Sequence, residues 1–155
     1  MNTTTRGAVV VRGSEARAVR WGPTGTIRIL GGADSTAGTF SVVEALEEPG
    51  SAAPLHVHHG EAEAFYVVDG TIELTCGDDT VTAGPGDFVH TPRDVPHRYA
   101  VVGDRPARVL LLFSRPGFES FFLEAGAPLD GPPGGPPSPE VLAKYDLELL
   151  GPPSH

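Results

Sequence analysis

The sequence predicts an all-β protein, a β-sandwich or jelly-roll barrel built from many short strands. About ten or eleven short stretches alternate apolar and polar side chains at close spacing, with turn residues between them. The 155 residues include 20 Gly and 16 Pro, which favour turns between short strands over long helices. No internal repeat is visible in the chain. These observations together indicate one β-rich domain, long enough to bury its own core.

The strand-like stretches divide the domain into segments. Residues 1–36 are expected to form an N-terminal arm with edge strands, at 18–21 and 26–30. Residues 37–114 are expected to form the barrel core. In the first core stretch, the residues taken to mark its apolar face are Phe40 and Val42, with Ala45 and Leu46 as further candidates. The predicted core strands or hairpins lie at 39–48, 54–68, 71–76, 80–83, 88–91, 97–102 and 107–113.

Residues 115–155 form a third segment, a helical, Pro-rich tail that is expected to pack on the outside of the barrel. Phe118 and Phe121 belong to a pattern with helical spacing, which favours a docking helix over a substrate lid. The stretch 127–137 is rich in Pro and Gly and is expected to be an extended linker. Ser138, followed by Pro and Glu, is typical of the N-cap and first turn of a short second helix.

Charge and cysteine content exclude several classes of function. The formal net charge is −9 and no basic run is present, so nucleic acid is not an expected partner. No apolar stretch approaches the roughly 18 residues of a membrane span, and no signal-peptide pattern is visible, so no membrane association is expected. Cys76 is the single cysteine and is interpreted as a buried free thiol on a strand. A lone thiol fits a reducing compartment, and we expect a cytoplasmic protein.

Residues 50–70 contain a candidate metal site. His56 and His58 are two residues apart, so both imidazoles point to the same face of a strand. Gly60 permits a tight turn, and Glu63 begins the next apolar run, which brings its carboxylate back beside the histidines. Two imidazoles and one carboxylate suit a divalent first-row transition metal and leave coordination positions open. For the H-x-H pattern alone, a pair of surface histidines beside a loop is the alternative.

His97 is the candidate fourth ligand. It follows a Pro-bounded turn and opens the predicted strand 97–102, and it joins the site if that strand lies beside the first hairpin. His59 is expected to face away from His58 and towards solvent. The direction in which His90 points from its strand is left open by the sequence.

These residues resemble the two conserved motifs of the cupin superfamily. The first motif, G-x5-H-x-H-x4-E-x6-G, is matched at every position by Gly50, His56, His58, Glu63 and Gly70. The second motif, G-x5-P-x-G-x2-H-x3-N, is matched by Gly86, Pro92 and His97 and departs at Asp94 and Val101. The resemblance covers about residues 37–114 and extends to small bacterial cupins of the quercetin-dioxygenase-like kind.

The resemblance implies a double-stranded β-helix barrel that holds one divalent metal ion with His56, His58, Glu63 and His97. Fe, Mn, Ni, Co and Cu accept such mixed donors, whereas Zn is less expected because structural zinc sites favour thiolates. The resemblance also implies that Glu63 can serve as a general base towards an acidic substrate hydroxyl. It further implies a homodimer.

The substrate pocket is expected to be apolar, which suits a flat or aliphatic small molecule better than a sugar. Arg28 and Arg98 are considered as rim contacts, with surface placement as the default. The residues expected to line or border the pocket are Phe65, Val67, Phe88, His90 and Tyr99.

Three functions remain open at this point. The first is a metal-dependent dioxygenase that uses O₂ and acts on a flavonol-like or other enolisable aromatic substrate. The second is a non-oxidative cyclase, isomerase or decarboxylase, in which the metal acts as a Lewis acid. The third is a non-catalytic protein that binds a small molecule. The sequence does not separate the first two, because both would use the same four ligands.

Overall fold

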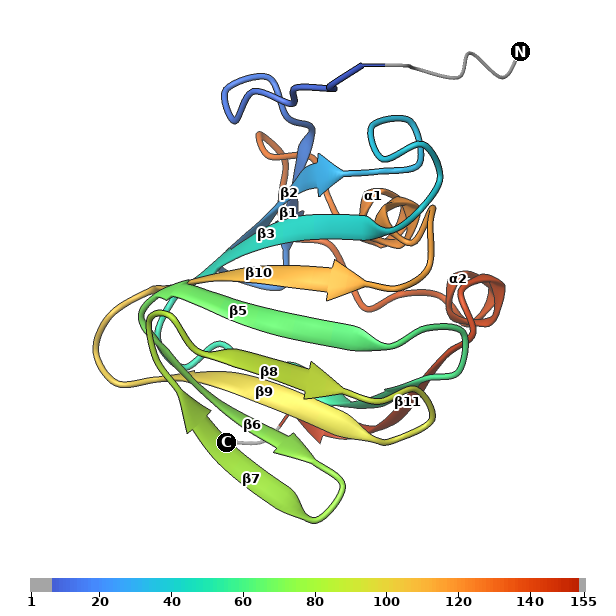
Figure 1. Ribbon diagram of the computed structural model, residues 1–155. Coiled ribbons are helices and arrows are strands. Elements are labelled where there is room, and N and C mark those ends of the chain that lie inside the picture. Colours follow the sequence, from blue (N-terminus) through green and yellow to red (C-terminus); the bar gives the residue numbers. More distant parts are fainter. Residues whose placement is uncertain (1–6, 154–155) are drawn as a thin grey trace.

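The computed structural model describes residues 7–153, which form two antiparallel β-sheets facing each other (Figure 1). The six-stranded sheet has the order β1-β2-β3-β10-β5-β8, and the five-stranded sheet has the order β11-β4-β9-β6-β7. Strands far apart in the chain are neighbours in both sheets, which is the connectivity of a jelly roll. The predicted fold class is therefore confirmed.

The elements follow the predicted order along the chain. The strands are β1 (Ala18–Trp21), β2 (Gly25–Gly31), β3 (Ser41–Glu47), β4 (Pro54–His58), β5 (Glu63–Asp69), β6 (Thr71–Cys76), β7 (Asp79–Ala83), β8 (Phe88–Thr91), β9 (His97–Val102), β10 (Ala107–Phe113) and β11 (Leu147–Pro153). The helices are α1 (Glu119–Ala125) and α2 (Pro139–Lys144). Each predicted strand has a counterpart, and Ser138 caps α2 by accepting the Val141 N–H.

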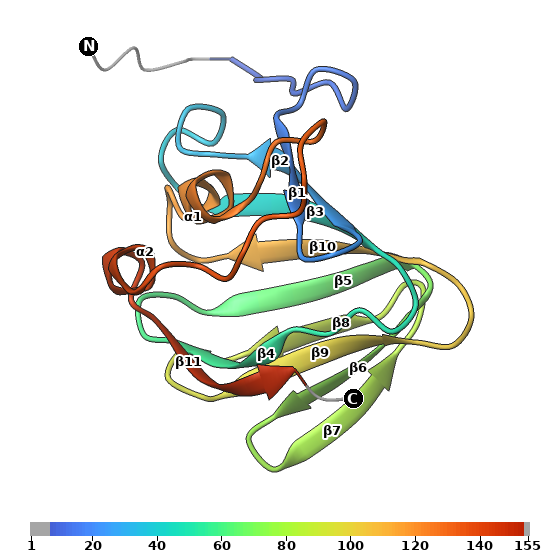
Figure 2. The ribbon, with the colours of Figure 1, turned by 180° about the vertical axis from the view of Figure 1, so that it is seen from behind.

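The C-terminal tail does more than pack on the outside of the barrel. β11 adds to the five-stranded sheet and pairs antiparallel with β4, with Leu147 opposite His58 and Leu149 opposite His56. Figure 2 shows β11 running along β4 at the back of the molecule. The strand that carries two candidate metal ligands is thus hydrogen-bonded to the end of the chain. The sequence had indicated only a last apolar run here.

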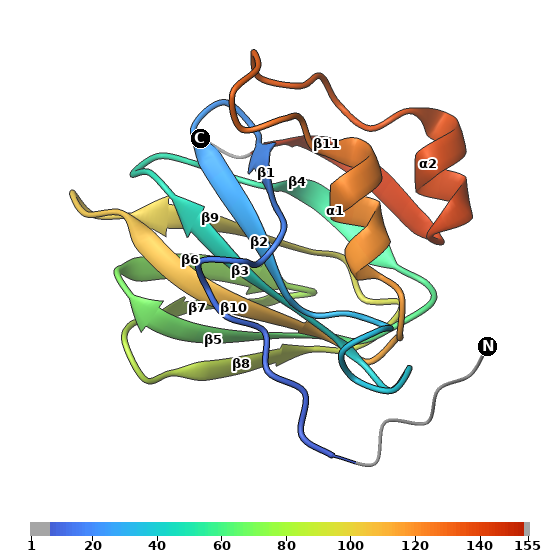
Figure 3. The ribbon, with the colours of Figure 1, turned by 90° about the horizontal axis from the view of Figure 1, so that it is seen from above.

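The helices lie on one side of the barrel, with α1 near β1 and α2 beside β11 (Figure 3). The α1 side chains Phe121 and Phe122 pack edge-on against Trp21. Their ring centroids lie 5.6 and 4.9 Å, respectively, from that of Trp21. This confirms a docking helix. Within residues 7–153, no helix is long and apolar enough to span a bilayer.

The face that β3 turns to the core differs in part from the prediction. Phe40 precedes the strand and is 47% exposed, and Leu46 is exposed as well, whereas Ala45 is fully buried, as expected, together with Val43. β3 pairs with β10 in a register that places Ala45 opposite Val109, and both side chains point into the barrel. The same alternation carries Glu47 into the interior, where it lies beside the Tyr99 hydroxyl.

The N-terminal segment is part arm and part sheet. β1 is an edge strand of the six-stranded sheet, as expected, whereas β2 pairs with both β1 and β3 and is not at the edge. Val9, Val10 and Val11 precede them in an exposed arm that forms no strand. The first six residues of the expected arm lie outside the described residues.

Candidate metal centre

The structure brings the four sequence-predicted ligands together. One side-chain ligand atom from each of His56, His58, Glu63 and His97 lies within 4.8 Å of the others. The group comes from β4, β5 and β9, and His56 lies directly opposite His97 in the β4–β9 pairing. Across residues 7–153, no second group of three or more such side chains is found. β9 lies beside β4, as the prediction of a fourth ligand required. The expected hairpin over 54–68 is wrong, however, because β4 and β5 belong to different sheets and face each other across the barrel instead of pairing.

The three histidine rings are oriented through their Nδ1 atoms, which face two backbone carbonyls and one buried carboxylate. Nδ1 of His56 lies 2.7 Å from the Pro54 carbonyl oxygen, and Nδ1 of His97 lies 3.3 Å from the Val95 carbonyl oxygen. When Nδ1–H donates to these acceptors, the Nε2 lone pair of each ring remains free for a metal. The backbone of the strand ends thereby fixes the tautomer that a ligand requires.

The donor set fits a divalent cation. Oε2 of Glu63 lies 3.0 Å from Nε2 of His58 and 2.9 Å from Nε2 of His97. In the neutral His58 with its proton on Nδ1, towards Glu61, the buried Nε2 faces the Glu63 carboxylate and has no hydrogen-bond donor. A buried polar atom without a partner is rare in folded proteins and requires an explanation. A cation among these atoms would satisfy the nitrogen and the carboxylate together, so these residues fit a metal ion.

The candidate ligands differ in whether their protonation state at pH 7 allows them to bind a metal. Burial lowers the pKa of His56 to about 4, and the neighbouring His97 adds to the effect. Burial also acts to lower the pKa of His58, but the carboxylates of Glu61 and Glu63 outweigh it and raise this pKa to about 9. For Glu63, burial acts to raise the pKa, but contacts with His58 and His97 hold it well below its usual range. His56 is therefore neutral and Glu63 ionised at pH 7, whereas His58 must lose a proton to bind a metal.

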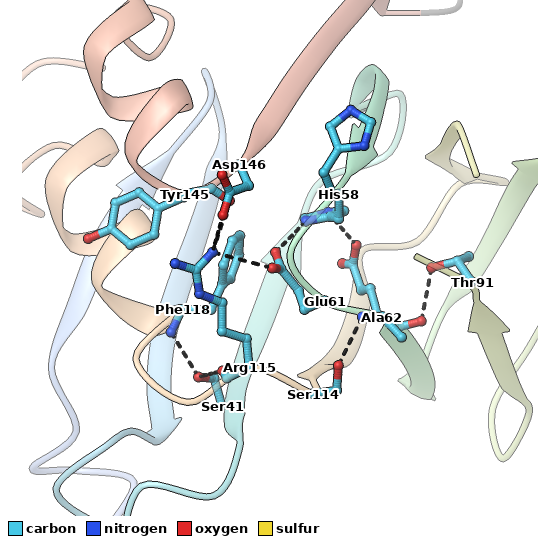
Figure 4. A network of polar contacts seen from close by, with 12 residues as sticks. Ser41, His58, Glu61, Ala62, Thr91, Ser114, Arg115, Phe118, Tyr145 and Asp146 are labelled. Carbon is cyan, nitrogen blue, oxygen red and sulfur yellow. Dashed lines mark hydrogen bonds and ion pairs between the residues drawn. The ribbon is translucent and has the colours of Figure 1, made fainter. Parts of the chain in front are cut away.

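Glu61 is a functional candidate that the sequence reasoning missed. Its side chain is fully buried, and its Oε1 lies 2.8 Å from Nδ1 of His58 (Figure 4). Its other oxygen, Oε2, has no hydrogen bond, and Nη1 of Arg115 lies 3.8 Å away. A carboxylate behind a ligating histidine fixes the ring and raises its basicity. The available signal was a second acidic residue in the short turn between His58 and Glu63.

Aromatic side chains surround the site. The His58 ring lies 5.4 Å from the ring of Phe118 and 5.8 Å from that of Phe113. The His97 ring lies 6.1 Å from the ring of Phe65. These contacts remove the imidazoles from water and strengthen the electrostatic interactions within the site.

Three of the expected pocket residues lie in the barrel interior. Phe65 and Val67 are fully buried, and Tyr99 packs on Phe65 at 5.5 Å between ring centroids. Phe88 was wrongly placed in the pocket, because its side chain is 62% exposed. It lies opposite Tyr66 in the β5–β8 pairing, on the outer face of the sheet.

A cavity of about 550 Å³ lies between the β6–β7 hairpin and β8, beside the candidate metal centre. Cys76, opposite His97 in the β6–β9 pairing, and Val89, opposite Phe65 in the β5–β8 pairing, both border it. The cavity therefore reaches the immediate neighbours of the ligands but not the ligands themselves. Its lining consists of Leu74, Cys76, Gly77, Asp78, Asp79, Val81, Val89, His90, Pro92 and Val95.

This lining answers two questions left by the sequence. His90 is exposed and yet borders the cavity. Cys76 is only partly buried and forms part of the cavity wall, so its thiol is less enclosed than predicted. A smaller cavity of about 120 Å³ lies at the opposite end of the barrel, around Gly70 and Arg105, away from the ligands.

Asp94, where the sequence departs from the second cupin motif, adopts a backbone conformation typical of glycine. Asp94 has a φ of 68°, in the left-handed region that favours glycine, the residue common in the motif at this position. Its carboxylate lies 2.7 Å from Nδ1 of His59, whose Nε2 lies 2.9 Å from Glu148. His59 thus faces solvent, as predicted, and joins the turn before β9 to β11.

Comparison with known proteins agrees with this architecture. A family model described as the cupin domain matches residues 43–113, the segment that contains all four candidate ligands. The chain carries a cupin domain. Among curated relatives, this cupin is 31% identical over 105 residues to quercetin 2,3-dioxygenase of Bacillus subtilis, a match that covers 67% of the chain and 31% of that protein.

Solved structures give the same fold. A mutant of Bacillus subtilis oxalate decarboxylase OxdC matches with a TM-score of 0.63 and 25% identity, over 74% of this cupin and 32% of that chain. The polyketide cyclase RemF from Streptomyces resistomycificus matches with a TM-score of 0.57 and 27% identity, over 66% of this cupin and 76% of that chain. The cupin thus spans about a third of the dioxygenase and of the decarboxylase.

Proposed function

We propose that this cupin is a metal-dependent dioxygenase that acts on a small flavonol-like or other enolisable aromatic substrate. The observation that carries the proposal is the three-histidine, one-glutamate cluster next to an apolar cavity. His56, His58, Glu63 and His97 would hold Fe, Mn, Ni, Co or Cu, and four protein ligands leave coordination positions open for substrate and O₂. Such an ion would supply Lewis acidity and the capacity for one-electron chemistry.

The protein's own contribution to the reaction centres on Glu63. Its carboxylate is ionised and buried among the histidines, so it can accept the proton of an acidic substrate hydroxyl. The fixed Nδ1–H donors of His56 and His97 keep the rings in place while this proton moves. The aromatic walls of Phe65 and Phe118 exclude water from the reacting groups.

The cavity supports the substrate class. Leu74, Val81 and Val89 give it apolar walls, and its volume is within the usual range for small-molecule sites. Asp78 and Asp79 lie at its margin, and no Lys or Arg of residues 7–153 lines it. This lining suits a neutral or weakly acidic aromatic compound, which must extend beyond Cys76 and Val89 to lose its proton to Glu63. It does not favour a small dicarboxylate anion.

A non-oxidative cyclase is the second candidate function. It is favoured by the likeness to the polyketide cyclase RemF, of which the match covers 76%. An isomerase or decarboxylase would use the same residues, with the metal again acting as a Lewis acid. A binding protein without catalytic activity is the third outcome that the experiment below distinguishes.

We also propose that the protein is a homodimer and that the outer face of the six-stranded sheet is its interface. Tyr66, Val68 and Phe88 expose apolar surface on the adjacent strands β5 and β8 of this face, and Leu46 does so on β3, on the far side of β10. Size-exclusion chromatography coupled to light scattering tests this proposal. Phe88→Glu is expected to give monomers. Glu73→Ala, on the other sheet, is the control and is expected to remain dimeric. A monomeric wild type would contradict it. The cytoplasmic location remains a prediction.

Oxygen consumption tests the proposed reaction. Metal-free protein is reconstituted separately with Fe(II), Mn(II), Co(II) and Ni(II) and mixed with a flavonol or another enolisable aromatic compound. We expect uptake that needs both metal and substrate and disappears with Glu63→Ala. Glu73→Ala removes an exposed carboxylate on β6 and is the matched control. Metal content is measured in each variant, because Glu63→Ala removes a proposed ligand as well as a base.

The outcomes separate the candidate functions. Substrate conversion without oxygen uptake would replace the dioxygenase by a cyclase or isomerase. Tight metal binding and substrate binding without conversion would indicate a binding protein. Uptake that continues in metal-loaded Glu63→Ala would rule out Glu63 as the base.

A further inference from the structure

Arg115 connects the candidate metal centre to the C-terminal segment (Figure 4). Its Nη1 atom lies 3.8 Å from Oε2 of Glu61, 3.0 Å from Oδ2 of Asp146 and 3.4 Å from the carbonyl oxygen of Tyr145. Glu61 in turn accepts a hydrogen bond at 2.8 Å from Nδ1 of His58. A continuous chain of polar contacts therefore runs from a metal-facing ring to the junction of α2 and β11.

Charge explains why the guanidinium is needed at this place. The Glu61 side chain is fully buried, and its Oε2 has no hydrogen bond. A buried carboxylate without a compensating cation is strongly disfavoured. Arg115, one third exposed, is the arginine that approaches it, so loss of this cation would leave the Glu61 carboxylate free to rotate away from its present position. Glu61 would then no longer hold Nδ1–H of His58 as firmly.

Arg115 and Asp146 approach the Gly60 backbone closely. A Cβ atom on Gly60 would lie 2.7 Å from Nη1 of Arg115 and 3.3 Å from Oδ2 of Asp146, so both side chains rest directly on the Gly60 backbone. Asp146 itself has a φ of 54°, a strained value for a residue other than glycine. Its carbonyl oxygen accepts the His59 N–H at 2.9 Å, where β11 starts to pair with β4.

We propose that Arg115 is a positioning residue that acts through Glu61 on His58 and couples the docking of residues 145–149 to metal binding. The proposal rests on the metal-binding part of the proposed function and is independent of the reaction. Coupling between two sites is reciprocal. If the docked segment strengthens metal binding, a bound metal must stabilise the docked segment by the same factor.

Metal affinity provides the first test. Dissociation constants for Ni(II), Co(II) and Mn(II) are measured by calorimetry or chelator competition for the wild type, Arg115→Met and Arg115→Lys. Arg115→Met should bind about 10- to 100-fold more weakly, the usual effect of losing an outer-shell partner. Arg115→Lys keeps the positive charge and should recover most of the affinity. Arg105→Met is the matched control, since Arg105 pairs with Asp69 at the far end of the barrel.

The route through Glu61 has its own test. If Arg115 acts on His58 only through Glu61, the double variant Glu61→Gln/Arg115→Met should bind metal no more weakly than the weaker single variant. Additive losses would show that Arg115 acts on the metal centre by another route and would overturn this part of the proposal.

Amide hydrogen exchange of residues 145–149 provides a readout that simple destabilisation would not reproduce. In the wild type, metal should slow exchange in this segment. In Arg115→Met this metal-dependent protection should be lost. In β6 and β7, metal should change exchange by the same amount in both proteins. An unchanged dissociation constant in Arg115→Met, or no effect of metal on 145–149 in the wild type, would overturn the proposal.

An Arg115→Met protein that does not fold and a wild type that binds no metal are the two remaining outcomes. If circular dichroism shows that Arg115→Met does not fold, Asp146→Asn replaces it, because this change weakens only the C-terminal end of the chain of contacts. It should weaken metal binding and abolish metal-dependent protection of 145–149. A wild type that binds no metal would overturn both this inference and the proposed function, whereas absence of oxygen uptake alone would leave the coupling intact.

Discussion

Nε2 of His97 lies 2.9 Å from Oε2 of Glu63, although 34 residues separate them in the chain. Neither residue reaches this position by local structure. Glu63 opens β5 in one sheet and His97 opens β9 in the other, so the contact bridges the two sheets at one end of the barrel. The candidate metal centre therefore exists only when the jelly roll is closed.

The ligand assignment predicts the metal content of single variants. His56→Ala and His97→Ala each remove one imidazole from the cluster and should lower metal affinity by at least about tenfold, the lower bound seen for outer-shell losses. Elemental analysis after dialysis measures the metal bound per chain. His90→Ala is the control, because His90 is exposed and lies outside the cluster. Full metal stoichiometry in the His56 and His97 variants would show that the site is misassigned.

Metal binding should release about one proton per ion at pH 7. His58 has a pKa of about 9 in the metal-free protein and must become neutral to bind, whereas His56 has a pKa of about 4 and is already neutral. Affinity should therefore rise between pH 7 and pH 9 by about tenfold per pH unit and fall below pH 7. Binding heats in buffers of different ionisation enthalpy count the protons, and identical heats in all buffers would contradict the prediction.

The same pKa predicts the pH dependence of the metal-free fold. Because the pKa of His58 is raised from 6.5 to about 9, its contribution to the free energy of unfolding is complete below pH 6.5 and is lost as the pH rises through 9. Urea unfolding of the metal-free protein between pH 6 and pH 10 checks this. The comparison is with His58→Gln, which should lack this loss.

Backbone strain at Asp94 predicts that two small substitutions differ in their effect on stability. Asp94→Gly relieves the left-handed strain at a φ of 68° and loses only an exposed ion pair, so its stability should change by less than about 1 kcal/mol. Asp94→Ala loses the pair and gains a side chain disfavoured in this region, so it should be about 1–2 kcal/mol less stable than Asp94→Gly. Urea unfolding of the metal-free proteins measures both, and equal stabilities would contradict the strain argument.

Burial at Phe118 predicts a large loss of stability. Phe118 is fully buried and packs on Phe113 at 4.4 Å between ring centroids, so Phe118→Ala should cost about 3–5 kcal/mol. Phe88→Ala truncates a side chain that is 62% exposed and should change the free energy of unfolding of the monomer by less than about 0.5 kcal/mol. Denaturant unfolding at low protein concentration compares them. Similar losses in both variants would mean that α1 and its preceding turn contribute little to the core.

Local patterns in the sequence determined the strands and the first ligands. Alternation over 71–76 and 97–102 predicted β6 and β9 with their observed bounds, because side-chain period and turn residues are encoded within a few positions. The same period placed His56 and His58 on one face, and the motif resemblance added Glu63 and His97.

Only the tertiary structure decided which side of each strand faces the core and what stands behind the ligands. Glu47 points inward and Phe88 outward, because the register with β10 and β5 fixes the faces and overrides hydrophobicity. Glu61 became recognisable only when His58 and Arg115 closed around it. β11 pairs with β4 across a long sequence separation, and such contacts depend on the closed barrel, which no short stretch of the sequence specifies.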